Sequence, residues 1–228
     1  HEAMPWPEAA RPSSRQMLAC AQFSRYADPR LAGHGALPQD GLPWLPLSEL
    51  LQTMLETGRL QLPWLEPTGF SDLRFAAPLP LPAAVTRECR ITARSQSWLL
   101  QDGVMTRMCH VRLQSRDLAP NLRRINHFSP LARGMVFLAA AAGSLPPLWE
   151  GEMTATGPEL PLEGFYADCG MAEGWHLVEE LVPAGNDLWQ GRFDGRAQGI
   201  APAGKSGYCS LLSAVDAILQ AACRIMED

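Results

Sequence analysis

The chain has 228 residues, enough to bury the core of one large domain or of two small ones. Its 24 acidic residues outnumber its 19 lysines and arginines, and it has no basic run or arginine-rich stripe, which argues against nucleic-acid binding. No apolar run reaches the length that spans a membrane, since the longest, Met135–Ala142, is far too short, and no N-terminal signal peptide is recognisable.

Six cysteines are spread along the chain without a CxxC pair, and most of them have apolar neighbours. We therefore expect free thiols in a reducing compartment, in this case the cytoplasm. Cys109 and His110 form the only cysteine–histidine doublet, but they lie in a strand-like stretch where neighbouring side chains point to opposite faces. The sequence therefore predicts no metal site.

The first half of the chain is expected to follow an irregular lead-in, residues 1–16, which is rich in Pro, Ser and Arg and begins like a cloning remnant. Residues 17–115 then form the first predicted half. Within it, Leu47–Thr57 carries apolar residues at helical spacing on one face, so we predict a helix there. Ser48 is placed to help cap its start, and Gly58 is placed to end it.

Strand-like patterns follow this helix. Val85–Ala93 and Gln96–Leu100 are predicted strands. The sequence Gln-Asp-Gly at 101–103 is a hairpin turn signal, after which Val104–Leu113 is predicted to return antiparallel. A short helix followed by an antiparallel meander makes an α+β unit.

A long connector with many Pro and Gly residues is expected at 116–160. It contains the apolar run Met135–Ala142, for which periodicity does not decide between helix and strand. The second predicted half, residues 161–228, contains two strand-like segments, His176–Leu181 and Asp187–Asp194, and ends in a long helix.

The final helix is predicted at Tyr208–Met226, where apolar residues recur at intervals of three and four. Asp216 is the only ionisable carboxylate between Tyr208 and Cys223, and Gln220 follows it one helical turn later. Burying a carboxylate is costly unless it has a partner, so an isolated one among apolar neighbours is a candidate functional group. The alternative is an aspartate at the helix edge that reaches solvent.

Two segments resemble motifs of one enzyme family. The stretch from His34 to Pro43, His-Gly-Ala-Leu-Pro-Gln-Asp-Gly-Leu-Pro, resembles the His-x-x-x-Gly-x-x-x-x-Pro motif of the dehydratase domains of modular type I polyketide synthases and related polyunsaturated fatty acid synthases. The stretch Asp216–Gln220 is similar to the Asp-x-x-x-Gln/His motif of the same domains. The resemblance implies a double hot dog fold, in which two antiparallel sheets each wrap a central helix.

The resemblance also implies a reaction, the loss of water from a 3-hydroxyacyl thioester by a dehydratase (a lyase). His34 would be the base that removes the α-proton, and Asp216 would protonate the departing hydroxyl group. Gln220 would orient Asp216 or the water, while Pro43 and Gly174 would belong to the substrate-binding surface. No cofactor is implied, because the substrate is carried on the phosphopantetheine of an acyl carrier protein. That carrier protein and neighbouring synthase domains would be the partners, with a homodimer as a further option.

The sequence departs from the family pattern at two places. Pro38 replaces the motif glycine and removes a backbone N–H donor from the loop that would help hold the thioester carbonyl. In the stretch that corresponds to the Tyr-Gly-Pro-x-Phe motif, Glu173, Trp175 and Leu177 replace the tyrosine, the proline and the phenylalanine. The alternative function is therefore an impaired dehydratase-like domain with a structural, acyl-binding or double-bond isomerase role. A single hot-dog thioesterase fits poorly, because the chain is long and has the second motif.

Overall fold

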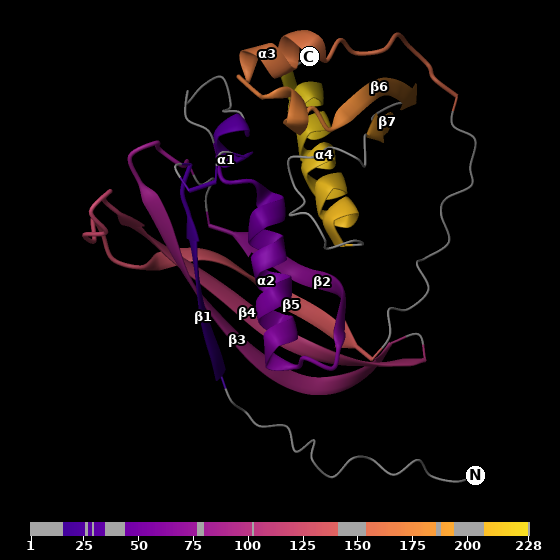
Figure 1. Ribbon diagram of the computed structural model, residues 1–228. Coiled ribbons are helices and arrows are strands. Elements are labelled where there is room, and N and C mark those ends of the chain that lie inside the picture. The colour runs from indigo at the N-terminus through magenta and orange to yellow at the C-terminus, as the bar shows by residue number, and fades with distance from the viewer. Residues whose placement is uncertain are drawn as a thin grey trace.

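Two helices, α2 (Leu47–Gln61) and α4 (Tyr208–Glu227), pack against each other, and antiparallel strands cover each of them (Figure 1). The computed structural model describes residues 16–25, 27–28, 30–34, 44–76, 80–101, 103–140, 154–185, 188–193 and 208–227. Both helices form where the sequence places apolar residues at intervals of three and four, so both predicted helices are confirmed.

A five-stranded antiparallel sheet curves around α2, in the strand order β1-β3-β4-β5-β2 (Figure 1). Side chains along its strands alternate between the buried face toward α2 and the outer face. The strands are β1 (Gln16–Phe23), β2 (Glu66–Phe75), β3 (Thr86–Gln101), β4 (Val104–Leu118) and β5 (Ser129–Ala139).

The β3–β4 hairpin forms at the predicted turn. The two strands pair as far as Gln101 and Val104, and Gly103 has a φ of 79°, which glycine adopts without steric cost. The segments predicted separately at 85–93 and 96–100 form the single strand β3, with an irregularity in its pairing between Ser95 and Trp98. The antiparallel meander is therefore confirmed.

The main hydrophobic core lies between α2 and the inner face of the sheet. On α2, Leu51, Met54 and Leu55 are buried, and Met54 has 0% exposed surface. They belong to one cluster with strand residues such as Ile91 and Val136. Each fully buried side chain of this size stabilises the fold by about 1.5–3 kcal/mol. The core therefore fixes α2 in place, and with it the first turn of this helix.

Gly58 lies inside α2, which continues to Gln61, so the prediction that this glycine ends the helix is wrong. A Cβ atom at this position would lie 3.2 Å from Cγ1 of Val136, so the glycine allows α2 to approach β5 closely. The reason for the glycine is a tertiary contact, which the local sequence pattern does not contain.

The strand β5 corrects the connector expected at 116–160. The apolar run that periodicity left undecided is a strand, hydrogen-bonded between β4 and β2. In addition, β4 continues to Leu118, beyond the predicted end of the first half at residue 115. The first sheet therefore extends to Ala139, because this apolar strand completes the cover of α2.

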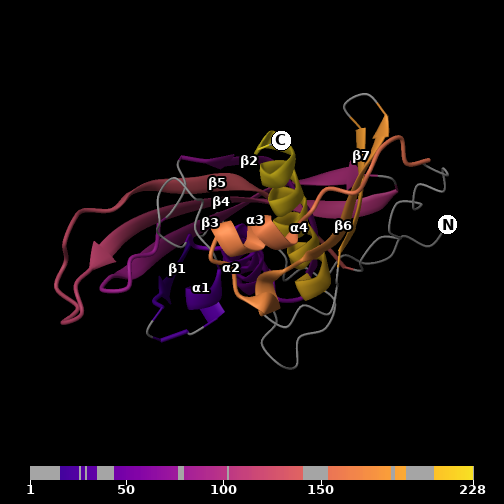
Figure 2. The same cartoon turned by 90° about the horizontal axis from the view of Figure 1, so that it is seen from above.

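The second part of the chain packs around α4 and contributes less sheet. Its two strands form an antiparallel hairpin against one side of α4, and Leu177, Leu181 and Ala217 are buried between them. Seen from above, α4 and the hairpin lie on the same side of the large sheet as α2 (Figure 2). A sheet that wraps α4 was expected, and these are the two strands described for it. The remaining elements are α1 (Arg30–Gly33), α3 (Glu163–Asp168), the 3-10 helix η1 (Glu173–Trp175), β6 (Val178–Gly185) and β7 (Leu188–Phe193).

The buried thiols of Cys89 and Cys109 stay protonated near neutral pH. Cys20, Cys89 and Cys109 are free thiols. Burial raises the pKa of Cys89 to about 12 and that of Cys109 to about 11, so neither is a thiolate near neutral pH. In the part of the chain that the structure describes, no three His, Cys, Asp or Glu side chains are grouped to bind a metal. Nor is any helix in that part long and apolar enough to cross a membrane.

Candidate active site

His34 follows the short helix α1, and a hydrogen bond fixes its ring. Nδ1 lies 3.0 Å from the backbone oxygen of Trp44. A carbonyl oxygen only accepts hydrogen bonds, so Nδ1 carries the proton and donates it, while Nε2 keeps a free lone pair. The neutral ring is thus held in the tautomer in which Nε2 can act as a base.

A tryptophan forms one wall around the His34 ring. The indole of Trp175 meets the imidazole edge-on, with 4.7 Å between the ring centroids and 81° between the planes. The N–H of Ala172 donates to the backbone oxygen of Gly33 at 2.9 Å, which ties the η1 segment to the residue before His34. Burial lowers the pKa of His34 to about 4, and the hydrogen bond to Trp44 opposes this only in part. The imidazole is therefore neutral at physiological pH.

Asp216 lies on α4, with its carboxyl group buried against the first turn of α2. Its exposed fraction is 3%, which excludes an edge aspartate that reaches solvent. Oδ1 accepts a hydrogen bond from the backbone N–H of Ser48 at 3.4 Å. Burial raises the pKa of Asp216 to about 6, while the hydroxyl and amide groups of Ser48 and the amide of Leu47 lower it. The carboxyl group therefore gains or loses its proton much closer to neutral pH than a surface aspartate.

The start of α2 explains why a carboxyl group is stable at this place. The N-cap residue is Pro46, which makes no side-chain capping hydrogen bond. The first amides of a helix have no acceptor within the helix, and they favour a negative charge. Asp216 therefore caps α2 from another helix, in place of the local capping by Ser48 that the sequence suggested.

One short segment, which runs into the first turn of α2, holds both titratable groups. Trp44 supplies the backbone acceptor for His34, and Ser48 supplies the backbone donor for Asp216. The two groups come from motifs far apart in the sequence. The folded chain thus connects both motifs through residues 44–48.

Gln220, one turn after Asp216 on α4, directs its amide group toward the second part of the chain. Nε2 donates to the backbone oxygen of Trp175 at 3.0 Å. Oε1 accepts from the N–H of Leu177 at 3.2 Å and lies 3.2 Å from the hydroxyl group of Tyr166. The sequence suggested that Gln220 orients Asp216 or the leaving water, whereas these bonds fix the segment whose indole packs on the imidazole.

Of the remaining predicted site residues, the structure describes Gly174 but not Pro43. Pro43 and Pro38 both lie outside the described residues. Gly174 is the middle residue of η1, directly before Trp175. The structure adds three residues that the sequence analysis did not assign to the site: Trp44, Ser48 and Trp175. Their signals in the sequence were weak, since Trp175 was visible only as a tryptophan at a motif proline and Ser48 only as a serine near a helix start.

Known proteins with the same fold were found by structure. No family model and no curated protein matches the sequence. The dehydratase domain of the CurK module of the curacin polyketide synthase aligns with 96% of this chain and 74% of its own, with a TM-score of 0.60 and 14% identity. A structure from work on dehydratase substrate selection in the borrelidin and fluvirucin polyketide synthases aligns with 93% of this chain and 70% of its own, with a TM-score of 0.58 and 16% identity. The chain has the fold of a polyketide synthase dehydratase domain.

Two further structures with this dehydratase fold are inactive variants of the CurK dehydratase. In one, an aspartate is changed to asparagine; it aligns with 93% of this chain and 72% of its own, with a TM-score of 0.57 and 15% identity. In the other, a histidine is changed to phenylalanine; it aligns with 96% of this chain and 74% of its own, with a TM-score of 0.58 and 13% identity. CurK is thus inactive when one histidine or one aspartate is replaced.

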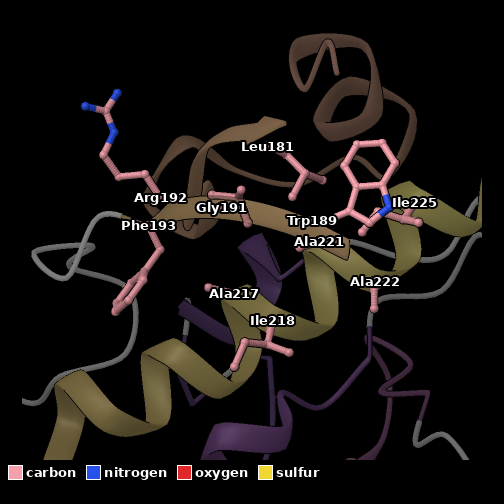
Figure 3. Close-up of a pocket in the computed structure, with 11 residues that line it drawn as sticks. Leu181, Trp189, Gly191, Arg192, Phe193, Ala217, Ile218, Ala221, Ala222 and Ile225 are labelled. Atoms are coloured by element: carbon pink, nitrogen blue, oxygen red, sulfur yellow. The ribbon is translucent and has the colours of Figure 1, made fainter. Parts of the chain in front are cut away.

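An apolar groove of about 300 Å³ lies in the second part of this dehydratase fold, between α4 and the β6–β7 hairpin (Figure 3). Trp189, Ala217 and Ile225 contribute to its lining. Ala217 follows Asp216 directly in the chain, but neither Asp216 nor His34 lines this groove. The groove therefore does not connect His34 with Asp216.

Replacing Asp216 by asparagine is expected to change how the stability of this dehydratase fold depends on pH. The pKa of about 6 in the folded protein lies above the ordinary value of 3.8, so the folded state disfavours the ionised carboxylate. Wild-type stability from this group is therefore lost as the pH rises from about 4 to about 6, by on the order of 3 kcal/mol. Asparagine does not titrate and keeps a side-chain oxygen that can cap α2.

The free energies of unfolding of the two proteins, measured by denaturant titration between pH 4 and pH 7, test this expectation. The difference between them should shift in favour of the variant as the pH rises. A difference that is constant with pH would mean that Asp216 titrates in the folded protein as it does in the unfolded chain.

Proposed function

We propose that this protein eliminates water from a 3-hydroxyacyl group bound as a thioester to an acyl carrier protein, with His34 as the base and Asp216 as the acid. One observation carries the proposal: a single segment binds both groups, through the backbone oxygen of Trp44 and the backbone N–H of Ser48. The fold of polyketide synthase dehydratase domains supports the same reaction.

His34 suits the removal of the α-proton, and Asp216 suits the protonation of the departing oxygen. Neutral His34 takes the proton from the carbon next to the thioester carbonyl through Nε2, because Nδ1 is bound to Trp44. The electron pair of that C–H bond forms the double bond as the bond between C3 and oxygen breaks. Protonated Asp216 gives its proton to the departing oxygen, which leaves as water.

The inactive CurK variants support this assignment, because a histidine and an aspartate are the residues replaced there. In this chain we assign a positioning role to Gln220, which holds Trp175 against the imidazole. Gly174, beside that tryptophan, and Pro43, which precedes α2 in the chain, would belong to the substrate-binding surface.

The complete fold would be a double hot dog with α2 and α4 as its two central helices. The five-stranded sheet around α2 and the β6–β7 hairpin on α4 support this architecture. The partners would be the acyl carrier protein, which presents the substrate on its phosphopantetheine, and neighbouring synthase domains. The reaction needs no other cofactor, and its setting would be the cytoplasm. We also propose that two copies of the protein form a homodimer.

The direct test is incubation of the protein with a panel of 3-hydroxyacyl groups of different length, each loaded on a carrier protein. Mass spectrometry of the carrier then shows whether the acyl group has lost one water. Loss from at least one member of the panel supports the proposal. Retention of the hydroxyl group across the whole panel, by a protein that is folded, contradicts it.

The rate of dehydration is expected to depend on pH, with a maximum between about pH 4 and pH 6. His34 must be neutral and has a pKa of about 4, while Asp216 must be protonated and has a pKa of about 6. Above pH 6, kcat/KM should fall about tenfold for each pH unit, because this ratio follows ionisation of the free enzyme. A profile that stays flat from pH 5 to pH 8 would exclude Asp216 as the acid.

One observation favours the alternative of an impaired dehydratase-like domain with a structural role. Asp216 caps α2, whose own N-cap residue makes no side-chain capping hydrogen bond, so its carboxyl group has a structural reason to be present. Pro38→Gly distinguishes an enzyme that is impaired by the missing donor from a domain with a structural role, because the change restores the N–H donor of the motif. A gain in dehydration rate would indicate an impaired enzyme, and no gain with an intact fold would indicate a structural role.

A further inference from the structure

Three polar atoms around the start of α2 are buried without a hydrogen-bond partner in the described part of the chain: Trp44 Nε1, Ser48 Oγ and Asp216 Oδ2. Buried polar atoms in folded proteins are nearly always paired. These three belong to the segment that holds the two titratable groups, or to the carboxyl group itself. Two of them, Ser48 Oγ and Asp216 Oδ2, belong to residues that the hydrogen bond from the Ser48 N–H brings together, so one further polar group can contact both.

Ser48 offers two groups to the Asp216 carboxyl group and is itself only 1% exposed. Its backbone N–H donates to Oδ1 at 3.4 Å. Its hydroxyl group lies near enough to lower the pKa of Asp216, yet Oγ makes no hydrogen bond of ordinary geometry with the described residues. The Ser48 N–H thus binds one carboxyl oxygen, and the amide of Leu47 also acts on the carboxyl group. Asp216 Oδ2 and Ser48 Oγ make no hydrogen bond of ordinary geometry with the described residues.

The position of this pair favours a neutral group that can both donate and accept hydrogen bonds. The first turn of α2 disfavours a cation, because its amides carry partial positive charge. Asp216 disfavours an anion whenever its carboxyl group is ionised. A hydroxyl group can donate to Ser48 Oγ and accept from a protonated carboxyl group at the same time.

We infer that Ser48 Oγ and Asp216 Oδ2 together bind the 3-hydroxyl group of the substrate, which makes Ser48 a further catalytic residue; this inference rests on the proposed function. The substrate O–H donates to Ser48 Oγ, and its oxygen accepts from protonated Asp216. When the bond between C3 and oxygen breaks, its electron pair stays on the oxygen, the Asp216 proton joins it, and water leaves. The α-proton is then on His34, and the Ser48 N–H stabilises the carboxylate that remains.

The inference is tested by ligand binding, without turnover. The His34→Phe protein, with the rest of the chain unchanged, lacks the proposed base and should hold substrate unreacted. Its affinities for 3-hydroxyhexanoyl-pantetheine and for hexanoyl-pantetheine, which lacks only the hydroxyl group, are compared by calorimetry. The hydroxylated thioester should bind about tenfold more tightly, since a buried hydroxyl group gains two hydrogen bonds.

Adding Ser48→Ala should abolish this preference, and so should Ser48→Cys, which keeps a side chain of similar size with a much weaker hydrogen-bonding group. The matched control is Ser115→Ala, at a buried serine on β4, which should keep the preference. Circular dichroism confirms that each variant is folded. The inference is overturned if the parent protein shows no preference for the hydroxylated ligand, or if Ser48→Ala and Ser48→Cys retain it.

The same experiment separates this inference from the proposed function. Suppose that the preference depends on Ser48 but wild-type protein removes no water from any carrier-bound substrate. The proposed function would then be refuted, and the hydroxyl-binding site would stand.

Discussion

Replacing His34 by phenylalanine, or Asp216 by asparagine, is expected to slow dehydration of a carrier-bound 3-hydroxyacyl group by about 10²–10⁴-fold. His34→Phe removes the base and keeps a flat ring beside Trp175. Asp216→Asn keeps an acceptor for the Ser48 N–H and removes the acidic proton. A slower rate in these variants therefore reflects the loss of the base or the acid more than a change in side-chain packing. Mass spectrometry of the carrier protein over time measures it.

The matched controls are His127→Phe and Asp168→Asn, the same two changes at exposed positions outside the site. Both should dehydrate the substrate at the wild-type rate. A similar loss in the controls would indicate damage to the protein rather than to the reaction. Full activity in either site variant would refute the role assigned to that residue.

Local patterns were sufficient for much of the fold. The two helices follow from the spacing of their apolar residues, and the β3–β4 hairpin follows from an Asp-Gly turn between strand-like segments. The errors arose where a distant contact decides the structure. Gly58 stays inside α2 because Val136 packs on it, and β5 is a strand because it pairs with both β4 and β2.

The sequence predicted individual residues of the candidate site better than it predicted how they lie relative to one another. The sequence left open whether Asp216 is buried or reaches solvent at the helix edge, and its exposed fraction of 3% decides for burial. Nothing local to Asp216 indicated that it meets the first turn of α2, because Pro46 and Ser48 are distant in the sequence. Trp175 was visible only as a departure from a motif, although its ring forms a wall of the His34 environment.

Trp175→Ala is expected to lower the free energy of unfolding by about 3–5 kcal/mol. The tryptophan is 2% exposed, and a Cβ atom on Gly33 would lie 3.3 Å from its Cδ1, so the indole fills the space beside that glycine. Alanine would leave a cavity between η1 and α1, and the truncated side chain would lose its contact with His34. Denaturant unfolding measures the loss. Trp64→Ala, at a residue that is 63% exposed, is the control and should cost less than about 0.5 kcal/mol.

The same variant tests how the protein keeps His34 neutral. Burial is the main cause that lowers the pKa of His34 to about 4, and Trp175 covers one side of that ring. In Trp175→Ala, water should reach the imidazole, and the His34 pKa should rise toward its ordinary value of 6.5. NMR titration of the histidine ring follows this change. An unchanged titration in a folded variant would show that other residues exclude water from His34. A raised pKa would mean that the indole at the motif proline keeps the base neutral under acidic conditions, where Asp216 is protonated.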